Sequence, residues 1–309
     1  MNAPPDHKER TPDLLEQVEG SGIEALPKRI DRYGDAKRRA LEVGEFIENR
    51  HDLAFSGDLA RRVCECGNYL VFRHYYTVDQ VRLYAAQFCM KHLLCPLCAI
   101  RRGSKALQAY LPRYEAVRLI EPELRPFLIT LTVKDGDDLG ERFAHLHKAQ
   151  RELWKRKHRG RGSVLDHVHG AVWSYEVKRG KGSCAWHPHL HMVAMSRTIP
   201  DQASLSREWL AITGDSFIVD VRSIDESDPA SGFLEVFKYA LKFSDMTPAD
   251  TLEAFCVLRK KRLVGSAGLF RGIDIPDDLT DTPLDDLPYV ELFYRYMARG
   301  YTLKGGPGR

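Results

Sequence analysis

The stretch Pro126-Phe-Leu-Ile-Thr-Leu-Thr-Val133 decides how the second half of this 309-residue chain folds. Its apolar and β-branched residues, followed by turn residues at 135–138, predict a strand. Strand-like runs also cover residues 170–178, 186–195 and 216–222, and helical patterns cover residues 142–161 and 201–212. The order strand, helix, strand, strand, helix, strand predicts an α+β fold. We expect a ferredoxin-like (split βαβ), mostly antiparallel sheet with helices on one face, after a helical, cysteine-rich N-terminal region.

The length of the chain corresponds to about two domains. No apolar run approaches the ~20 residues that a membrane span needs, so no membrane span is expected. Residues 1–30 contain no apolar signal core, which predicts a cytoplasmic protein with reduced thiols. We expect an N-terminal tail and helix (1–50), a cysteine-rich region (51–120), the sheet domain (121–270) and an acidic linker with a C-terminal segment (271–309).

Charge is unevenly distributed, although 46 basic and 43 acidic residues give a net charge of only +3. Eight Lys and Arg residues lie between Arg142 and Arg161, against one acid, Glu152. This basic helix is either a solvated face or an anion-binding surface; the candidates for DNA contacts are Arg151, Lys155, Arg156, Lys157 and Arg159. Seven acids and three prolines between residues 274 and 291 predict a linker or mobile flap.

Five of the seven cysteines fall within residues 64–98. Four thiolates on two short turns suit a structural Zn²⁺ site, and Cys95-Pro-Leu-Cys98 has the spacing of a zinc knuckle. The candidates are Cys66, Cys89, Cys95 and Cys98, with Cys64 competing with Cys66 for one place. We favour Cys66 because Gly67 follows it, and the alternatives are a redox pair or ordinary buried cysteines.

Three His-x-His pairs occur, at residues 145–147, 167–169 and 189–191. Two imidazoles at positions i and i+2 face the same way on a strand, whereas on a helix they diverge by about 200°. This favours His189 and His191, which lie inside an extended run. Glu176 lies in the preceding strand of a predicted hairpin and can reach the same face. Two imidazoles and one carboxylate leave coordination positions open, which suits Mg²⁺ or Mn²⁺ bound with a substrate phosphate. The alternative places Glu176 on a solvated face.

A predicted helix over residues 233–243 carries Glu235, Tyr239 and Lys242 in one stripe, opposite its apolar side. This stripe is either an ordinary surface or a reactive group. A phenol with a pKa of about 10 is a weak nucleophile, but a nearby metal and a cation favour attack by the phenolate.

These motifs together resemble the HUH endonucleases, and specifically the rolling-circle replication initiators of small bacterial plasmids with one catalytic tyrosine plus a glutamate. Residues 127–133 are similar to the first strand motif of the family, His187-Pro-His-Leu-His191 to its metal-binding motif, and Tyr239-Ala-Leu-Lys242 to its Tyr-x-x-Lys motif. The cysteine-rich region ahead of the nuclease also matches this branch. His187 adds a third histidine, so either Glu176 or His187 could complete the catalytic metal site.

The resemblance implies that Tyr239 attacks a phosphodiester in single-stranded or hairpin origin DNA, leaving a 3′-OH and a 5′-phosphotyrosyl link. Lys242 would steady the phosphate, and Glu235 would activate a water at termination. A host helicase and a host DNA polymerase are the expected partners. A relaxase, a transposase or a non-catalytic zinc-containing DNA-binding regulator remain alternatives, and the oligomeric state, a homodimer included, is left open.

Overall fold

The computed structural model describes residues 21–50, 52, 56–160, 162–237, 246–284 and 286–305. The α-helices in these residues are α1 (Leu26–Glu48), α2 (Ser56–Glu65), α3 (Pro96–Ile120), α4 (Leu139–His158), α5 (Gln202–Thr213), α6 (Pro229–Phe237) and α7 (Pro248–Leu258). The strands are β1 (Tyr69–Tyr75), β2 (Gln80–Ala86), β3 (Arg125–Thr132), β4 (Val168–Arg179), β5 (Trp186–Ser196), β6 (Val219–Ser223), β7 (Val264–Gly268), β8 (Val290–Met297) and β9 (Gly300–Gly305).

A five-stranded sheet has the order β6-β3-β5-β4-β7, and every neighbouring pair is antiparallel. Its first four strands have the order of a ferredoxin-like sheet, so the predicted α+β class is confirmed. The residues that the sequence marks as helix ends lie where helices begin and end. Gly214 ends α5 in the left-handed region at φ 77°, and Thr247 and Asp250 form a capping box at α7.

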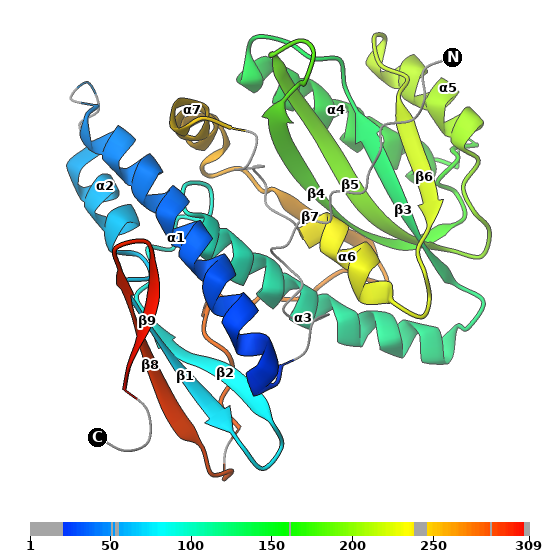
Figure 1. Ribbon diagram of the computed structural model, residues 1–309. Helices are drawn as coiled ribbons and strands as arrows, with labels where there is room; N and C mark the ends of the chain where they lie inside the picture. The colour runs from blue at the N-terminus through cyan, green and yellow to red at the C-terminus, as the bar shows by residue number, and fades with distance from the viewer. Residues whose placement is uncertain are drawn as a thin grey trace.

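Helices cover both faces of this sheet rather than the single face expected from the sequence (Figure 1). Helices α4 and α5 pack on the side of Ile129 and Leu131, as the split βαβ connection requires. Helices α3 and α6 pack on the opposite side, which carries Val172 and Val193. The reason is that β4 and β5 are apolar on both sides over part of their length, and each apolar patch must be covered.

A second antiparallel sheet, with the order β2-β1-β8-β9, was not expected from the sequence. The C-terminal hairpin β8–β9 pairs with β1, more than 200 positions earlier in the chain. The inner face of this sheet, with Leu70 and Phe72, packs with α1 and the buried cysteines in one hydrophobic core. Figure 1 shows it beside α1 and α2, at the other end of the molecule from β6.

Part of the acidic segment is tightly packed, in contrast to the expected linker or mobile flap. Asp281 is buried, and its carboxylate accepts hydrogen bonds from Arg101 Nη2 at 2.5 Å and Arg29 Nη2 at 2.9 Å. The backbone N–H of Leu83 in β2 donates to the same carboxylate at 2.7 Å. Because two guanidinium groups and a backbone amide satisfy it, this carboxylate joins α1, α3 and β2.

Candidate functional site

The candidate catalytic site lies on adjacent strands of the five-stranded sheet. Glu176 in β4 is directly opposite His189 in β5, and His191 follows two residues later on the same face. The Glu176 carboxylate oxygens lie 3.4 Å from Nε2 of His189 and 3.4 Å from Nε2 of His191. All three candidate ligand atoms lie within 4.8 Å of one another. The hairpin predicted from the sequence therefore brings together one carboxylate and two imidazoles.

Hydrogen bonds orient both rings so that their Nε2 atoms face Glu176. His189 Nδ1 lies 3.4 Å from the backbone oxygen of His187, which can only accept, so this nitrogen carries a proton. His191 Nδ1 lies 3.1 Å from the hydroxyl of Thr130 in β3. Partners of this kind on the second ring nitrogen are typical of metal-binding histidines.

The electrostatics of the group favour a bound cation. Burial by itself raises the pKa of the Glu176 carboxyl, but His189 and His191 outweigh burial and hold that pKa well below its usual range. Burial lowers the pKa of His189 to about 4, although Glu176 opposes this shift. An ionised carboxylate beside a neutral imidazole leaves negative charge in a buried place, which is costly unless a cation compensates it. The donor set therefore fits a divalent metal ion with open positions.

His187 does not join this group. Its Nδ1 contacts the carboxylate of Asp135 in the β3–α4 loop, which also accepts from the hydroxyl of Ser183. Its ring centroid lies 5.5 Å from that of His189. Of the two alternatives left open by the sequence, the structure places Glu176 rather than His187 with the pair of histidines.

Helix α6 approaches the same face of the sheet. The hydroxyl of Ser174, opposite His191 and two residues before Glu176, donates to the backbone oxygen of Val236 near the C-terminal end of α6. Glu235 lies in this last turn and is half-buried. Tyr239 and Lys242 lie outside the described residues, which end at Phe237 on this side.

A second group, formed by Cys66, Cys89, Cys95 and Cys98, is fully buried in the core between α1, α3 and the four-stranded sheet. Three Sγ–Sγ distances are 3.5, 3.5 and 3.6 Å, far longer than a disulfide of about 2.05 Å. They approach the edge of about 3.8 Å that four sulfurs have around a zinc ion with Zn–S bonds of about 2.3 Å. Cys66, and not Cys64, lies in this group.

The thiol chemistry of this group also suits a metal. Contact with Cys66 lowers the pKa of Cys89 and raises the pKa values of Cys95 and Cys98. Four sulfurs this close can ionise together only if a cation joins them. Gly67 turns the chain after Cys66 at φ 71°, and its backbone oxygen accepts a 2.6 Å hydrogen bond from Tyr301 in β9. The C-terminal hairpin therefore closes over the cysteine group.

The basic residues proposed for DNA contacts are not close to the histidines. Arg151 and Lys155 are exposed on the second half of α4, which packs on the face of the sheet opposite Glu176, and Arg159, just after the end of this helix, is exposed as well. Arg156 and Lys157 are half-buried, and Lys157 donates to the backbone oxygen of Asp166. A DNA strand at the histidines and a DNA segment on α4 would thus contact different sides of the sheet.

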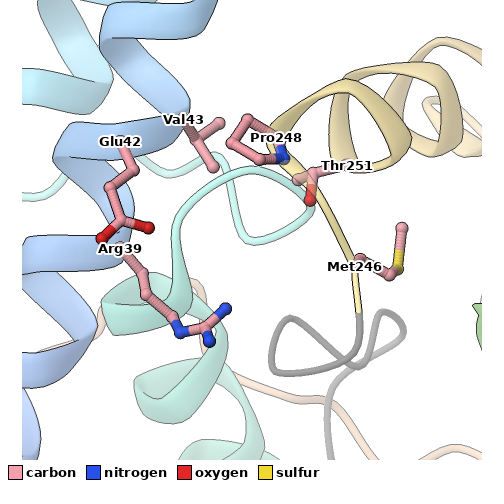
Figure 2. Close-up of a pocket in the computed structure, with 6 residues that line it drawn as sticks. All are labelled: Arg39, Glu42, Val43, Met246, Pro248 and Thr251. Carbon is pink, nitrogen blue, oxygen red and sulfur yellow. The ribbon is translucent and has the colours of Figure 1, made fainter.

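A small pocket lies between α1 and the start of α7, where the described chain resumes at Met246 (Figure 2). Arg39, Glu42 and Val43 of α1 line one side, and Met246, Pro248 and Thr251 line the other. It is separate from the histidines and contains none of the predicted site residues.

Sequence reasoning missed the residues that support the site. Thr130 contacts His191, Ser174 donates to helix α6, and Asp135 contacts His187. Each of these three residues lies in or next to a predicted strand. The alternation of β3 and β4 could have placed Thr130 and Ser174 on the histidine face, but their partners depend on strand order.

Within the described parts of the chain, no helix is long and apolar enough to span a bilayer.

Comparisons with known proteins show which family the chain is similar to. A family model described as "Replication protein" matches residues 80–291. "Protein rep" of Bacillus amyloliquefaciens is 26% identical over 86% of this chain and 88% of its own length. "Protein rep" of Streptococcus pneumoniae serotype 2 is 28% identical over 81% of each chain, and that of Lactiplantibacillus plantarum is 26% identical over 82% of this chain and 85% of its own. No solved structure matches.

Proposed function

The chain belongs to the replication-protein family, and on that premise we propose that it initiates plasmid rolling-circle replication by nicking one strand of origin DNA. The observation that carries the proposal is the buried group of Glu176, His189 and His191, on the sheet face that α6 contacts through Val236. Tyr239 follows the last described residue of α6 by two positions. The described part of α6, which ends two positions before Tyr239 in the sequence, thus lies beside a candidate phosphate-activating site.

In the proposed reaction, the phenolic oxygen of Tyr239 attacks the phosphorus of one phosphodiester in single-stranded or hairpin origin DNA. A bond forms between phosphorus and the tyrosine oxygen, the bond to the 3′ oxygen breaks, and the phenolic proton ends on that 3′ oxygen. The products are a 5′-phosphotyrosyl link and a free 3′-OH, which a host polymerase extends in the cytoplasm while a host helicase unwinds the duplex. Lys242 offsets negative charge on the phosphate.

Glu176, His189 and His191 would hold Mg²⁺ or Mn²⁺, which supplies Lewis-acid polarisation of the phosphate when bound. Two imidazole donors favour Mn²⁺, because Mg²⁺ prefers an all-oxygen environment. The buried carboxylate and the oriented rings keep the donor atoms converged before any ion arrives, so little reorganisation is needed.

Glu235, in the last turn of α6 and four residues before Tyr239 in the sequence, would take a proton from water when the replicated strand is released. The four-cysteine group would hold a structural Zn²⁺, with Cys66 rather than Cys64 as a ligand. The cations of α4 would contact origin DNA outside the cleaved strand, since they lie beyond the opposite face of the sheet.

The test is to incubate the protein with Mn²⁺ and a labelled pool of single strands that contain candidate origin hairpins. We expect a denaturant-resistant protein–DNA band, mapped by mass spectrometry to Tyr239. Tyr239→Phe should lose the band and keep DNA binding, whereas Tyr76→Phe, at an exposed position of the β1–β2 turn, should keep both. An unchanged band in Tyr239→Phe would refute the assignment of the nucleophile.

A further inference from the structure

The outer face of the four-stranded sheet carries exposed aromatic rings that neither metal site uses. Tyr69, Tyr84 and Phe293 are 37%, 39% and 37% exposed, respectively. Strand β8 alternates strictly, with residues 291, 293, 295 and 297 exposed and residues 292, 294 and 296 half-buried. Tyr69 pairs with Arg295, and Arg73 pairs with Arg82. Because residues two apart on a strand share a face, Tyr84 and Phe293 lie on the same outer side as these four residues. We call Tyr69, Arg73, Arg82, Tyr84, Phe293 and Arg295 the aromatic–arginine face.

The rings on this face are held in place. The rings of Tyr69 and Phe293 lie 6.2 Å apart at an interplanar angle of 24°, so they form one nearly continuous apolar surface. The Arg73 guanidinium carbon lies 3.3 Å from the centre of the Tyr84 ring. Arg73 also donates from Nε to Glu291 at 3.0 Å. Rings that are fixed before binding lose little conformational entropy when a flat ligand stacks on them.

The charge of the face is positive. Glu291 is the acid on β8 here, and Arg73 pairs with it, so Arg82 and Arg295 contribute the net charge. Of the acids in the nearby segment 277–281, Asp277 pairs with Arg102 and Asp281 pairs with Arg29 and Arg101. The third, Asp278, accepts hydrogen bonds from the backbone and hydroxyl of Thr280. Aromatic rings interleaved with arginines and few acids are complementary to a chain of bases and phosphates.

We propose that the aromatic–arginine face binds single-stranded DNA, with bases stacked on Tyr69, Tyr84 and Phe293 and phosphates beside Arg82 and Arg295. The strand is single, because only unpaired bases expose their faces to such rings. The proposal rests on the proposed function, in which the protein nicks one strand of origin DNA. It adds a second DNA surface, on a different sheet from the histidines.

The test measures the affinity of the full-length protein for a fluorescent single strand without an origin sequence, by anisotropy. The double variant Tyr69→Ala/Phe293→Ala should bind at least about tenfold more weakly, since loss of a stacked ring typically costs between about fivefold and a hundredfold. Tyr69→Phe/Phe293→Tyr keeps both rings and should bind like the parent protein. Phe217→Ala removes a ring that is 59% exposed elsewhere and should have no effect.

A salt titration tests the arginines separately. Arg295→Gln should lower the slope of log affinity against log salt by about 0.7, the value for one phosphate contact on a single strand. This variant leaves the rings in place, so it carries the test if the alanine variant melts early or loses zinc. Unchanged affinity in the alanine variant would overturn the proposal, and so would an unchanged slope in Arg295→Gln.

Two further readouts separate this surface from the nuclease and from self-association. If the parent protein forms the Tyr239 adduct while the alanine variant binds single strands normally, the surface is refuted and the nuclease stands. If no adduct forms but the alanine variant loses affinity, the surface stands without the nuclease. If the alanine variant changes a dimer into a monomer by light scattering at unchanged affinity, the face joins two copies of the chain and the proposal fails.

Discussion

Replacing Asp281 by alanine should destabilise the protein by about 3–5 kcal/mol, because it leaves two buried guanidinium groups without their shared counter-ion. The side chains of Arg101, Asp281 and Arg29 are only 1%, 6% and 9% exposed. The carboxylate also accepts the Leu83 N–H, so its loss leaves a backbone donor of β2 unsatisfied as well. Because these groups are buried, water cannot easily replace the lost carboxylate, so the free energy of unfolding should fall by the full amount of about 3–5 kcal/mol.

The assay is urea unfolding of the full chain, followed by far-ultraviolet circular dichroism. With a denaturant slope of about 3 kcal/mol per M, the loss corresponds to a midpoint lower by roughly 1–2 M. Asp277→Ala is the matched control, because Asp277 also pairs with an arginine but its side chain is 94% exposed. That variant should change stability by less than about 1 kcal/mol.

The same carboxylate predicts a pH dependence. Burial raises the pKa of Asp281, but Arg101 and Arg29 outweigh burial and hold that pKa well below its usual range. A carboxyl whose pKa is lower in the folded state stabilises the protein fully above its unfolded pKa of about 4, and this contribution is lost as the pH falls. The midpoint difference between the parent protein and Asp281→Asn should therefore be constant from pH 5 to 8 and shrink below about pH 4. Equal midpoints for Asp281→Ala and Asp277→Ala at neutral pH would refute the reasoning.

Two further predictions concern the metal groups. Cys66→Ser should lose the zinc measured by elemental analysis of the purified protein, whereas Cys64→Ser should keep it, because only Cys66 lies with the other three thiols; equal zinc in both variants would contradict this. Glu176→Gln should weaken Mn²⁺ binding by more than about 100-fold in calorimetry, and Thr130→Val by about 10- to 100-fold, because Thr130 only orients His191. If Thr130→Val binds Mn²⁺ more weakly than Glu176→Gln, the assignment of the carboxylate as a ligand is wrong.

The sequence by itself was sufficient for features with local causes. The period-two pattern around Ile129 and the turn before Trp186 predicted the central strands, and Gly214 and Thr247 marked helix ends. The hairpin that lets Glu176 reach the histidines also followed, because a hairpin brings near neighbours in the chain together, whereas the choice of Glu176 over His187 came from the structure. The knuckle at Cys95 and Cys98 indicated a metal group for the same reason.

Only the tertiary structure decided the features that depend on distant parts of the chain. Exposed and half-buried residues alternate along the strand at residues 290–297. No local pattern specifies that this strand pairs with β1. That pairing carries Tyr301 to Gly67 and creates the aromatic–arginine face. Asp281 lies in a segment whose composition predicted a linker or mobile flap, and only the tertiary structure places Arg29 and Arg101 around it. The physical reason is that residue periodicity records which side of an element is buried, whereas the partner that buries it is chosen by long-range packing.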